Sequence, residues 1–490
     1  MTVPEAAIKI LQEYPDGLSA KKVTDEILAH KLHPLPAKDP VQIVARAMNR
    51  HCIGIDRSYS CQDRFFTASK DNTGLLIYKL VPGTVPTVAS IIGSFTFPRQ
   101  QVLTINNSKG AKTGAKTRIM DAENQSVRDL LGKYLIFETL NDRGLALSAV
   151  DLIKNKLFQI FATHPGEFEQ LKSAWEEMCD NIENKDDLKK FILHYWRAYK
   201  GFTSPQSLYK TYRDYVATNG FEEAKKIVLD LKKLSVYYNG FCDPMGEYPW
   251  KNKELKTTLE DMKKMRYDLT HPILLAAIGK YPNDEASWAK VAKLCLNFLI
   301  RYISVLKNKP TSVEKEISQW ACDPNFGLDM LRDNFASKAP DGQFRDQLLS
   351  LTMPHTLPLT HYLLCVYEAD GCGRKEIWTT PGRGNNTVEH VLPQTVKPTT
   401  EWGKYWISQF GSVEDCDTYK DRLGNYAFLT KEAQAKALNK AFHLKKVVYR
   451  DDTDMKLTQE LALCAEWNLE EINKRQARMA DVWVTSISFS

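Results

Sequence analysis

The sequence predicts a mainly α-helical multidomain protein (α+β), with short extended segments near its two ends. The chain has 490 residues, which is enough to build several separate hydrophobic cores. Apolar residues recur at helical spacing through most of the middle of the chain. Short extended segments with Gly, Pro or polar residues at their ends gather before about residue 80 and after about residue 371. We therefore expect four parts: 1–80, a linker at 81–125, a helical domain at 126–370, and a last domain at 371–490.

The composition is that of an ordinary soluble protein, with 43% hydrophobic and 26% charged residues. No run of 18 apolar residues occurs, and the first residues lack the basic and apolar regions of a signal peptide. These features predict a cytoplasmic protein with no membrane partner. The ten cysteines form no CxxC pair, which argues against a zinc site and favours reduced, buried thiols.

The first 80 residues predict three helices followed by a β-hairpin, which is the order of a winged helix. "VPEAAIKILQEY" and "LSAKKVTDEILAHKL" have helical spacing, and Ser19 is a suitable N-cap for the second helix. The third helix, "DPVQIVARAMNRH", is expected to start at Asp39–Pro40. These segments resemble the HARE-HTH family, a resemblance that implies a DNA-binding or DNA-sensing winged-helix domain.

The third helix of this unit is the one expected to enter the major groove of DNA. Because winged helices also dock proteins, and the unit has 11 basic and 9 acidic residues, a protein-docking role stays open. The candidate nucleic-acid contacts are Gln42, Arg46, Asn49, Arg50, Arg57 and Arg64.

The chemistry is concentrated in three ordered stretches near the C-terminus. They read "TVEHVLPQ" (387–394), "YKDRLGNYAFLT" (419–430) and "AQAKALNKAFHLKK" (433–446). A strand that ends in an acid and a His, a second strand with Asn, and a following helix with amide side chains describe a ββα-metal fold. Such a site needs an oxygen ligand for a divalent cation and a neutral His that takes a proton from water.

These stretches resemble the HNH nuclease domain of the GmrSD type over about residues 371–450. The match lies at "EHVLPQ", "RLGNYAFL" and "NKAFHLKK", and Trp402 stands where that family carries a tryptophan. The resemblance implies that Glu389 binds the metal, that His390 is the general base, and that Asn425 braces the loop around the histidine.

One position departs from the family pattern, because Gln434 stands where the family usually has a metal-binding Asn. The expected metal ligands are therefore Glu389, Gln434 and Asn439, with His443 as an alternative, and the expected ion is Mg²⁺ or Mn²⁺. The segment from Lys420 to Arg450 contains eight basic and two acidic residues, which gives a local charge of +6. This patch suits a phosphate backbone, although a solvated helix face would have the same composition. Its candidate nucleic-acid contacts are Arg422, Lys440, Lys445 and Lys446.

A second stretch, "FETLNDRGLALSAVDLIKNKLF" (137–158), resembles the end of the nucleotide-dependent partner domain of GmrSD proteins. No DGQQR signature occurs in the chain, and the space before Phe137 is too short for the rest of that domain. We interpret the stretch as a truncated remnant without NTP hydrolysis. Within it, Asn141, Arg143, Gly144 and Asp151 would be remnants of that domain with a structural role only.

The leading hypothesis is thus a Mg²⁺-dependent HNH endonuclease that cuts double-stranded DNA in restriction of foreign, including modified, phage DNA. The alternative is a catalytically decayed DNA-binding or adaptor protein of a defence system. An RNA-directed nuclease also stays open, because nothing in the sequence reports on the sugar. A second copy of the chain, or another subunit of the defence system that supplies the missing NTPase, is the expected class of protein partner.

Overall fold

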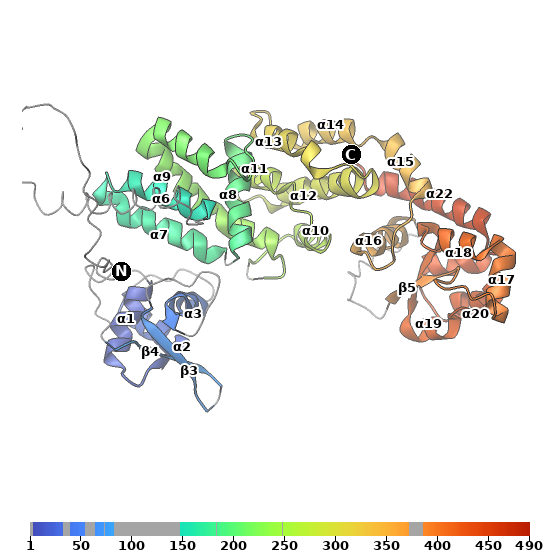
Figure 1. Cartoon of the computed structure of the whole chain (residues 1–490), viewed down its shortest axis with the longest axis horizontal. Helices are drawn as coiled ribbons and strands as arrows, with labels where there is room; N and C mark the ends of the chain where they lie inside the picture. The colour runs from blue at the N-terminus through green and yellow to red at the C-terminus, as the bar shows by residue number, and fades with distance from the viewer. Residues whose placement is uncertain are drawn as a thin grey trace, which may run out of the picture. The chain divides into compact units, whose positions relative to one another are not determined.

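The computed structural model describes residues 3–32, 40–53, 64–72, 74–82, 148–182, 184–246, 248–371 and 386–490. The protein is mainly helical with two small sheets, as the sequence predicts (Figure 1). It divides into two compact units, and each is described by itself. The first comprises residues 1–193 and 203–239, and the second comprises residues 194–202 and 240–490.

The N-terminal part contains the three helices and the hairpin that the sequence predicts. The helices are α1 (Val3–Glu13), α2 (Ala20–Ala29) and α3 (Pro40–Arg50), and the strands are β1 (Leu18–Ser19), β2 (Cys52–Ile53), β3 (Phe66–Lys70) and β4 (Leu76–Leu80). The strands form one sheet in the order β1-β4-β3-β2, with β3 and β4 antiparallel. The Ser19 hydroxyl accepts a hydrogen bond from the Lys22 amide, so the predicted N-cap is confirmed.

This part has its own hydrophobic core between the helices and the sheet. Ala7, Val23 and Val44 come from the three helices, and Phe66 and Tyr78 come from the hairpin; all are at most 2% exposed. An amphipathic helix gains most of its stability from packing of this kind rather than from its intrinsic propensity. The repeated apolar positions of the sequence therefore define the inner face of each helix.

The other described residues of the first unit belong mainly to four helices, two of which continue into the second unit. These helices are α6 (Ala149–Phe161), α7 (Pro165–Asn181), α8 (Lys185–Tyr199) and α9 (Leu208–Cys242). The sequence predicts Ser148 as the N-cap of the helix in the stretch 137–158, and its capping box with Asp151 at the start of α6 confirms this cap. The helical spacing of apolar residues predicts two separate helices at 207–217 and 221–239. They follow one another in α9 and meet at Gly220, whose φ of 76° breaks the helical backbone.

The second unit begins with a layered array of helices. They are α10 (Lys253–Lys264), α11 (His271–Lys280), α12 (Glu285–Leu299), a π-helical turn at Ile300–Val305, a 3₁₀ turn at Pro310–Ser312, α13 (Glu314–Cys322), α14 (Leu328–Lys338), α15 (Asp341–Ser350), α16 (Pro358–Val366) and a second π-helical turn at Tyr367–Gly371. The aromatic residues at helical spacing are core residues here, as expected. Phe298, Trp320 and Phe335, for example, form one ring cluster.

The C-terminal part of this unit is a two-stranded ribbon surrounded by short helices (Figure 1). Its elements are β5 (Asn386–His390), α17 (Glu401–Phe410), α18 (Val413–Tyr419), a 3₁₀ turn at Leu423–Asn425, β6 (Tyr426–Thr430), α19 (Lys431–Ala437), α20 (Phe442–Asp451), α21 (Lys456–Gln459), a 3₁₀ turn at Glu460–Leu463, and α22 (Leu469–Ser486). Strands β5 and β6 are antiparallel, and the packing of α22 against the turn at Leu423–Asn425 anchors the start of β6.

Two predicted helices in this part are each divided. The helix expected over 433–446 becomes α19 and α20, because the backbone of Leu438 is left-handed (φ 43°). The second is the last amphipathic helix, which helical spacing predicts over 457–483. It becomes α21 and α22, because Asn468 caps a new helix with its side chain. Asn439 therefore lies in the turn between α19 and α20 and not on a helix.

Several sequence predictions concern residues outside the described ranges. They include most of the linker at 81–125, the start of the helical domain expected at 126–370, the remnant residues Asn141 to Gly144, and residues 372–385 of the last domain, where the Gly residues of the sequence predict a loop. Among the described residues, no helix is both long and apolar enough to cross a membrane.

Candidate functional site

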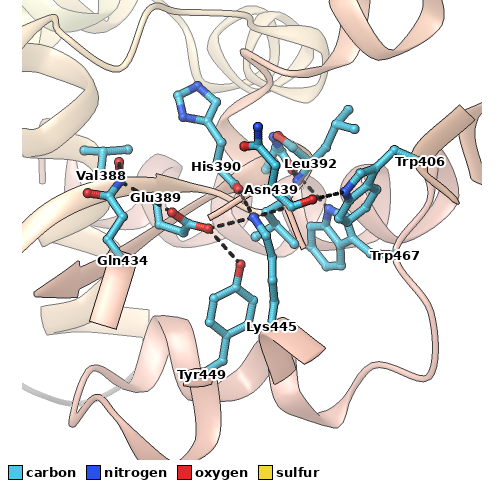
Figure 2. A network of polar contacts seen from close by, with 12 residues as sticks. Val388, Glu389, His390, Leu392, Trp406, Gln434, Asn439, Lys445, Tyr449 and Trp467 are labelled. Atoms are coloured by element: carbon cyan, nitrogen blue, oxygen red, sulfur yellow. Dashed lines mark hydrogen bonds and ion pairs between the residues drawn. The ribbon is translucent and has the colours of Figure 1, made fainter. Parts of the chain in front are cut away.

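The β5–β6 ribbon sends its two chemically informative residues to opposite faces. Glu389 lies opposite Ala427, and His390 lies opposite Tyr426 in the antiparallel register. Successive side chains of a strand alternate between faces. Figure 2 accordingly shows the His390 ring pointing away from Glu389, Gln434 and Lys445. The ribbon therefore has a Glu389 face and a His390 face.

On the Glu389 face, the carboxylate is buried and fully engaged by the protein itself. Its Oε1 accepts hydrogen bonds from Lys445 Nζ at 2.8 Å and from the Tyr449 hydroxyl at 3.2 Å. Its Oε2 lies 3.4 Å from Gln434 Nε2. The side chains of Glu389 and Lys445 are 4% and 0% exposed, so the two form a buried ion pair (Figure 2).

Lys445 was expected near the phosphates, but its ammonium is turned inward toward the end of β5. Besides Glu389, it donates to the carbonyl oxygens of His390 at 2.8 Å and Val391 at 3.0 Å. Burial lowers the pKa of Lys445, and the charge of Glu389 opposes that shift. Its three donors are thus used to hold the strand end, and none is directed to a ligand in solution.

The other two expected metal ligands do not converge on Glu389. The Gln434 amide nitrogen faces Glu389 and the Val388 carbonyl, whereas its oxygen accepts from the Thr387 hydroxyl at 2.8 Å. Asn439 is exposed, and its backbone carbonyl accepts a hydrogen bond from Trp406 Nε1. A cation beside Glu389 would meet the Lys445 ammonium and an amide N–H. The expected ligand set of Glu389, Gln434 and Asn439 therefore does not fit a metal ion in this structure.

On the His390 face, three potential metal ligands gather from three segments. His390 Nε2 lies 3.4 Å from Asp421 Oδ1, and the His355 and His390 rings are 4.9 Å apart between centroids. One ligand atom from each of these residues lies within 4.8 Å of the others. His390 is 8% exposed, whereas the Asp421 side chain is 33% exposed, so this face opens to solvent.

The protonation state of His390 is set mainly by its burial. Burial lowers its pKa to about 4, and the nearby charges of His355 and Lys445 act in the same direction, while Asp421 opposes them. His390 is therefore a neutral imidazole near pH 7. A neutral imidazole can accept a proton or bind a metal ion.

Asn425 holds the loop that follows β5. Its Oδ1 accepts from the Leu392 amide at 2.7 Å and from Trp467 Nε1 at 3.0 Å. Its Nδ2 donates to the carbonyls of Leu392 at 3.0 Å and Lys420 at 2.8 Å. These four bonds leave a fully buried amide completely paired and connect the end of β5 to the segment that carries Asp421.

The other basic residues expected at the phosphates are also partly used inside the protein. Arg422 is 8% exposed and donates to Gln476, Asn473 and the Leu349 carbonyl. Lys446 donates to the Cys464 carbonyl at 2.6 Å. Lys440 is half-buried at the end of the turn before α20. The local charge of +6 is therefore not one continuous outward-facing patch.

In the N-terminal part, two of the candidate DNA contacts lie together on α3, and two others form hydrogen bonds with groups of the hairpin or of β2. Arg46 and Gln42 lie together on α3, with 3.3 Å between Arg46 Nη2 and Gln42 Oε1. Asn49 is 9% exposed and accepts from the Tyr78 hydroxyl at 2.8 Å, and Arg64 donates to the Cys52 carbonyl at 2.7 Å. The Arg50 side chain and Arg57 lie outside the described residues.

Sequence reasoning missed His355 and Asp421. Asp421 stands inside the stretch "YKDRLGNYAF", in which the sequence predicts Asn425 as the site residue. His355 lies 35 positions before His390. Only folding joins them: the Met353 amide donates to the Asp421 carbonyl, and Thr352 pairs with Arg422. A His between helices, in "MPHTLP", was the one local signal for a site residue.

The fold and the site together define a class of protein. The chain is a mainly helical multidomain protein whose C-terminal part carries a neutral histidine beside a carboxylate and a second histidine. Such groups suit proton transfer or metal-assisted hydrolysis.

Residues 339–482 match the family model described as "GmrSD restriction endonucleases, C-terminal domain". The matched region contains α15, the β5–β6 ribbon, α20 and most of α22, together with Glu389, His390 and Asn425. The match supports a nuclease function of the restriction endonuclease type for this region, with DNA as the substrate. No curated protein matches the chain significantly.

Proposed function

We propose that the C-terminal part of this protein is a divalent-metal-dependent HNH endonuclease that hydrolyses phosphodiester bonds of double-stranded DNA. Its biological role would be restriction of foreign DNA, including modified phage DNA. The observation that carries the proposal is the family match over residues 339–482, because it contains a buried, neutral His390 beside a solvent-accessible carboxylate. Cleavage is proposed to depend on the neutral imidazole of His390.

The surrounding residues support this role by holding His390 in place. Lys445 binds the carbonyl oxygens of His390 and Val391, and Asn425 binds both polar backbone groups of Leu392. A site held by buried hydrogen bonds of this kind keeps its groups oriented without reorganisation during the reaction. Asn425 and Lys445 are thus proposed as positioning residues.

The proposal includes DNA contact by the N-terminal part through α3. Gln42 and Arg46 are the described candidates that lie on the outer side of this helix. An Arg and a Gln four residues apart on one helix face are suited to base or phosphate contacts. Asn49 is excluded from such contacts by its buried hydrogen bond to Tyr78.

The test is cleavage by the full-length chain of plain, hydroxymethylated and glucosylated DNA, with Mg²⁺, with Mn²⁺ and with EDTA. We expect metal-dependent nicking or cutting that falls at least roughly a hundredfold in His390→Ala, the lower end of what a general acid–base group contributes. His164→Ala, which changes an exposed histidine outside the matched region, is the control. Equal products from the wild type and His390→Ala would contradict the proposal.

A second candidate function is favoured by one observation, the Glu389–Lys445 ion pair that occupies the expected metal position. In this reading the domain is a decayed nuclease that acts as a DNA-binding or adaptor module. It predicts DNA binding without cleavage under every metal condition of the same panel. Cleavage that is lost in His390→Ala would reject it.

A further inference from the structure

The His390 face of the ribbon carries a three-residue cluster formed by His355, His390 and Asp421. The three residues come from the loop between α15 and α16, from the end of β5, and from the segment before β6. This face is separate from the Glu389 face, which its own lysine closes.

The cluster is held in place by hydrogen bonds around it. The Met353 amide donates to the Asp421 carbonyl at 2.9 Å. The buried Tyr426 hydroxyl lies 2.8 Å from Asp421 Oδ1 and 2.9 Å from the Met353 carbonyl. The loop that carries His355 and the segment that carries Asp421 are therefore fixed to each other and to β6.

The distances within the cluster suit a shared cation better than a direct hydrogen bond. An N–H···O hydrogen bond is usually 2.7–3.2 Å long, roughly, whereas His390 Nε2 and Asp421 Oδ1 are 3.4 Å apart. Two ligand atoms bound to one ion at about 2.0–2.2 Å, with tetrahedral angles, lie roughly 3.3–3.6 Å from each other. The third atom, from His355, lies within 4.8 Å of the other two, so a small movement of its half-buried ring would complete the set.

We propose that His355, His390 and Asp421 bind one transition-metal dication of the Mn²⁺/Zn²⁺ class. Two imidazole nitrogens and one carboxylate are donors that these ions accept, whereas Mg²⁺ prefers oxygen ligands only. Three protein ligands leave a position open, as in catalytic and not in structural metal sites. In this site the neutral imidazole of His390 supplies one ligand, while Glu389 belongs to the framework.

The role of this site rests on the proposed nuclease function, but its existence does not. When bound, such an ion would supply a Lewis acid for a phosphate oxygen and a more acidic water. The exposed side of Asp421 gives the site its access to solvent.

The experiment measures metal binding by the full-length chain directly, without an activity readout. Calorimetry with Mn²⁺, Zn²⁺ and Mg²⁺ is combined with the visible absorption spectrum of the Co²⁺-loaded protein, which reports nitrogen and oxygen ligation. The test variants are His355→Gln and Asp421→Asn, and the matched controls are Gln434→Ala and Asn439→Ala, which remove the ligands expected from the sequence. We expect one Mn²⁺ or Zn²⁺ per chain, bound at least roughly tenfold more weakly by each test variant and unchanged in both controls.

Two results would overturn the proposal: affinity and cobalt spectrum unchanged in His355→Gln, or affinity lost in Gln434→Ala or Asn439→Ala. His355 is half-buried in a loop, so His355→Gln carries the test even if Asp421→Asn does not fold; hydrogen exchange in EDTA reports the fold of each variant.

Cleavage assays on the same samples separate the proposed metal site from the proposed nuclease function. Metal binding that needs His355 without any cleavage refutes the proposed function alone. Cleavage together with metal binding that ignores His355 refutes this site alone.

Discussion

The two faces of the β5–β6 ribbon differ in how completely their polar groups are paired. On one face, Glu389 receives hydrogen bonds from a lysine and a tyrosine and lies beside a glutamine amide, all within the protein. On the other face, His390 and Asp421 approach each other at a distance longer than a good hydrogen bond, and His355 stands beside them. The polar groups of the first face are paired with one another, whereas the second face brings three potential metal-ligand atoms within 4.8 Å of one another.

This difference follows from the geometry of a strand. Consecutive residues of a strand point to opposite faces, so Glu389 and His390 enter two different environments although they are adjacent in sequence. Burying a charged group is costly unless it is paired and hydrogen-bonded. Lys445 meets that need on the Glu389 face, and it simultaneously removes Glu389 from the candidate metal ligands.

The largest effect is expected from Lys445→Met, which leaves the Glu389 carboxylate buried and without its cation. We expect the opening free energy of β5 and β6 to fall by about 3–5 kcal/mol. Hydrogen exchange of the peptides that cover both strands, in the full-length chain, measures it. Lys440→Met is the control, since this half-buried lysine lies in the nearby turn. Adding Glu389→Gln to Lys445→Met should recover most of the loss. A loss of less than about 1 kcal/mol in Lys445→Met alone would show that the ion pair with Glu389 does not stabilise this face of the ribbon.

A second prediction concerns His361, a buried histidine on α16 whose ring lies 4.7 Å from that of Phe428 on β6. Burial lowers its pKa to about 4 from 6.5, and Lys264 acts in the same direction. Its other titratable neighbour is Cys365, with 3.4 Å between Sγ and Nδ1. Because the unfolded chain then binds more protons between about pH 6.5 and 4, stability must fall as the pH falls through this window.

The expected loss of stability is up to about 3.5 kcal/mol over that window, because the pKa of His361 differs by roughly 2.5 between the folded and unfolded chain and each pKa unit corresponds to about 1.4 kcal/mol. Hydrogen exchange of α16 and β6 in EDTA, as a function of pH, measures it. His361→Gln should flatten the pH dependence relative to the wild type, and His164→Gln should not, because His164 is exposed. His390 is retained in all three proteins, so its own contribution cancels. Identical pH profiles for the wild type and His361→Gln would contradict the prediction.

Local sequence signals predicted the fold well where the determining contact is short-range. The caps at Ser19 and Ser148 are confirmed, since a cap needs only the side chain and a backbone amide three residues away. The order of helices and hairpin in the first 80 residues is also present. Leu438, by contrast, adopts a left-handed backbone that its residue type does not favour, so the break between α19 and α20 could not be read from it.

The candidate site was predictable only in part for the same physical reason. The resemblance at "RLGNYAFL" implies that Asn425 braces the loop around the histidine, and the structure gives this residue four hydrogen bonds. The partners of Glu389 and His390 lie 31 to 60 residues away, in Asp421, Lys445 and Tyr449. The resemblance at "NKAFHLKK" implied that Lys445 lies near the phosphates, but the sequence cannot tell an inward ammonium from an outward one.

A third change, Asn425→Ala, tests whether the two faces share one support. It removes the partners of the Leu392 amide and carbonyl, of the Lys420 carbonyl and of Trp467 Nε1. We expect a loss of about 2–3 kcal/mol in the opening free energy of the loop after β5, since buried groups left unpaired are costly. The same variant should weaken Mn²⁺ binding, because Asn425 ties the end of β5 to the segment of Asp421. Unchanged metal affinity despite a destabilised loop would show that the His390 face is supported independently.

The smallest effect is expected from Gln434→Ala, on the face that the sequence marked as the metal site. This residue is half-buried, and its contacts with Glu389 and the Val388 carbonyl are long, at 3.4 and 3.3 Å. We expect a loss of about 1 kcal/mol, because Lys445 and Tyr449 still pair with Glu389. Hydrogen exchange of β5 measures it, and DNA cleavage in Mn²⁺ should stay within about twofold of the wild type, since the Glu389 face is framework. If cleavage were instead lost while the fold stayed intact, Gln434 would take part in the reaction, and the Glu389 face would be the catalytic face of the ribbon.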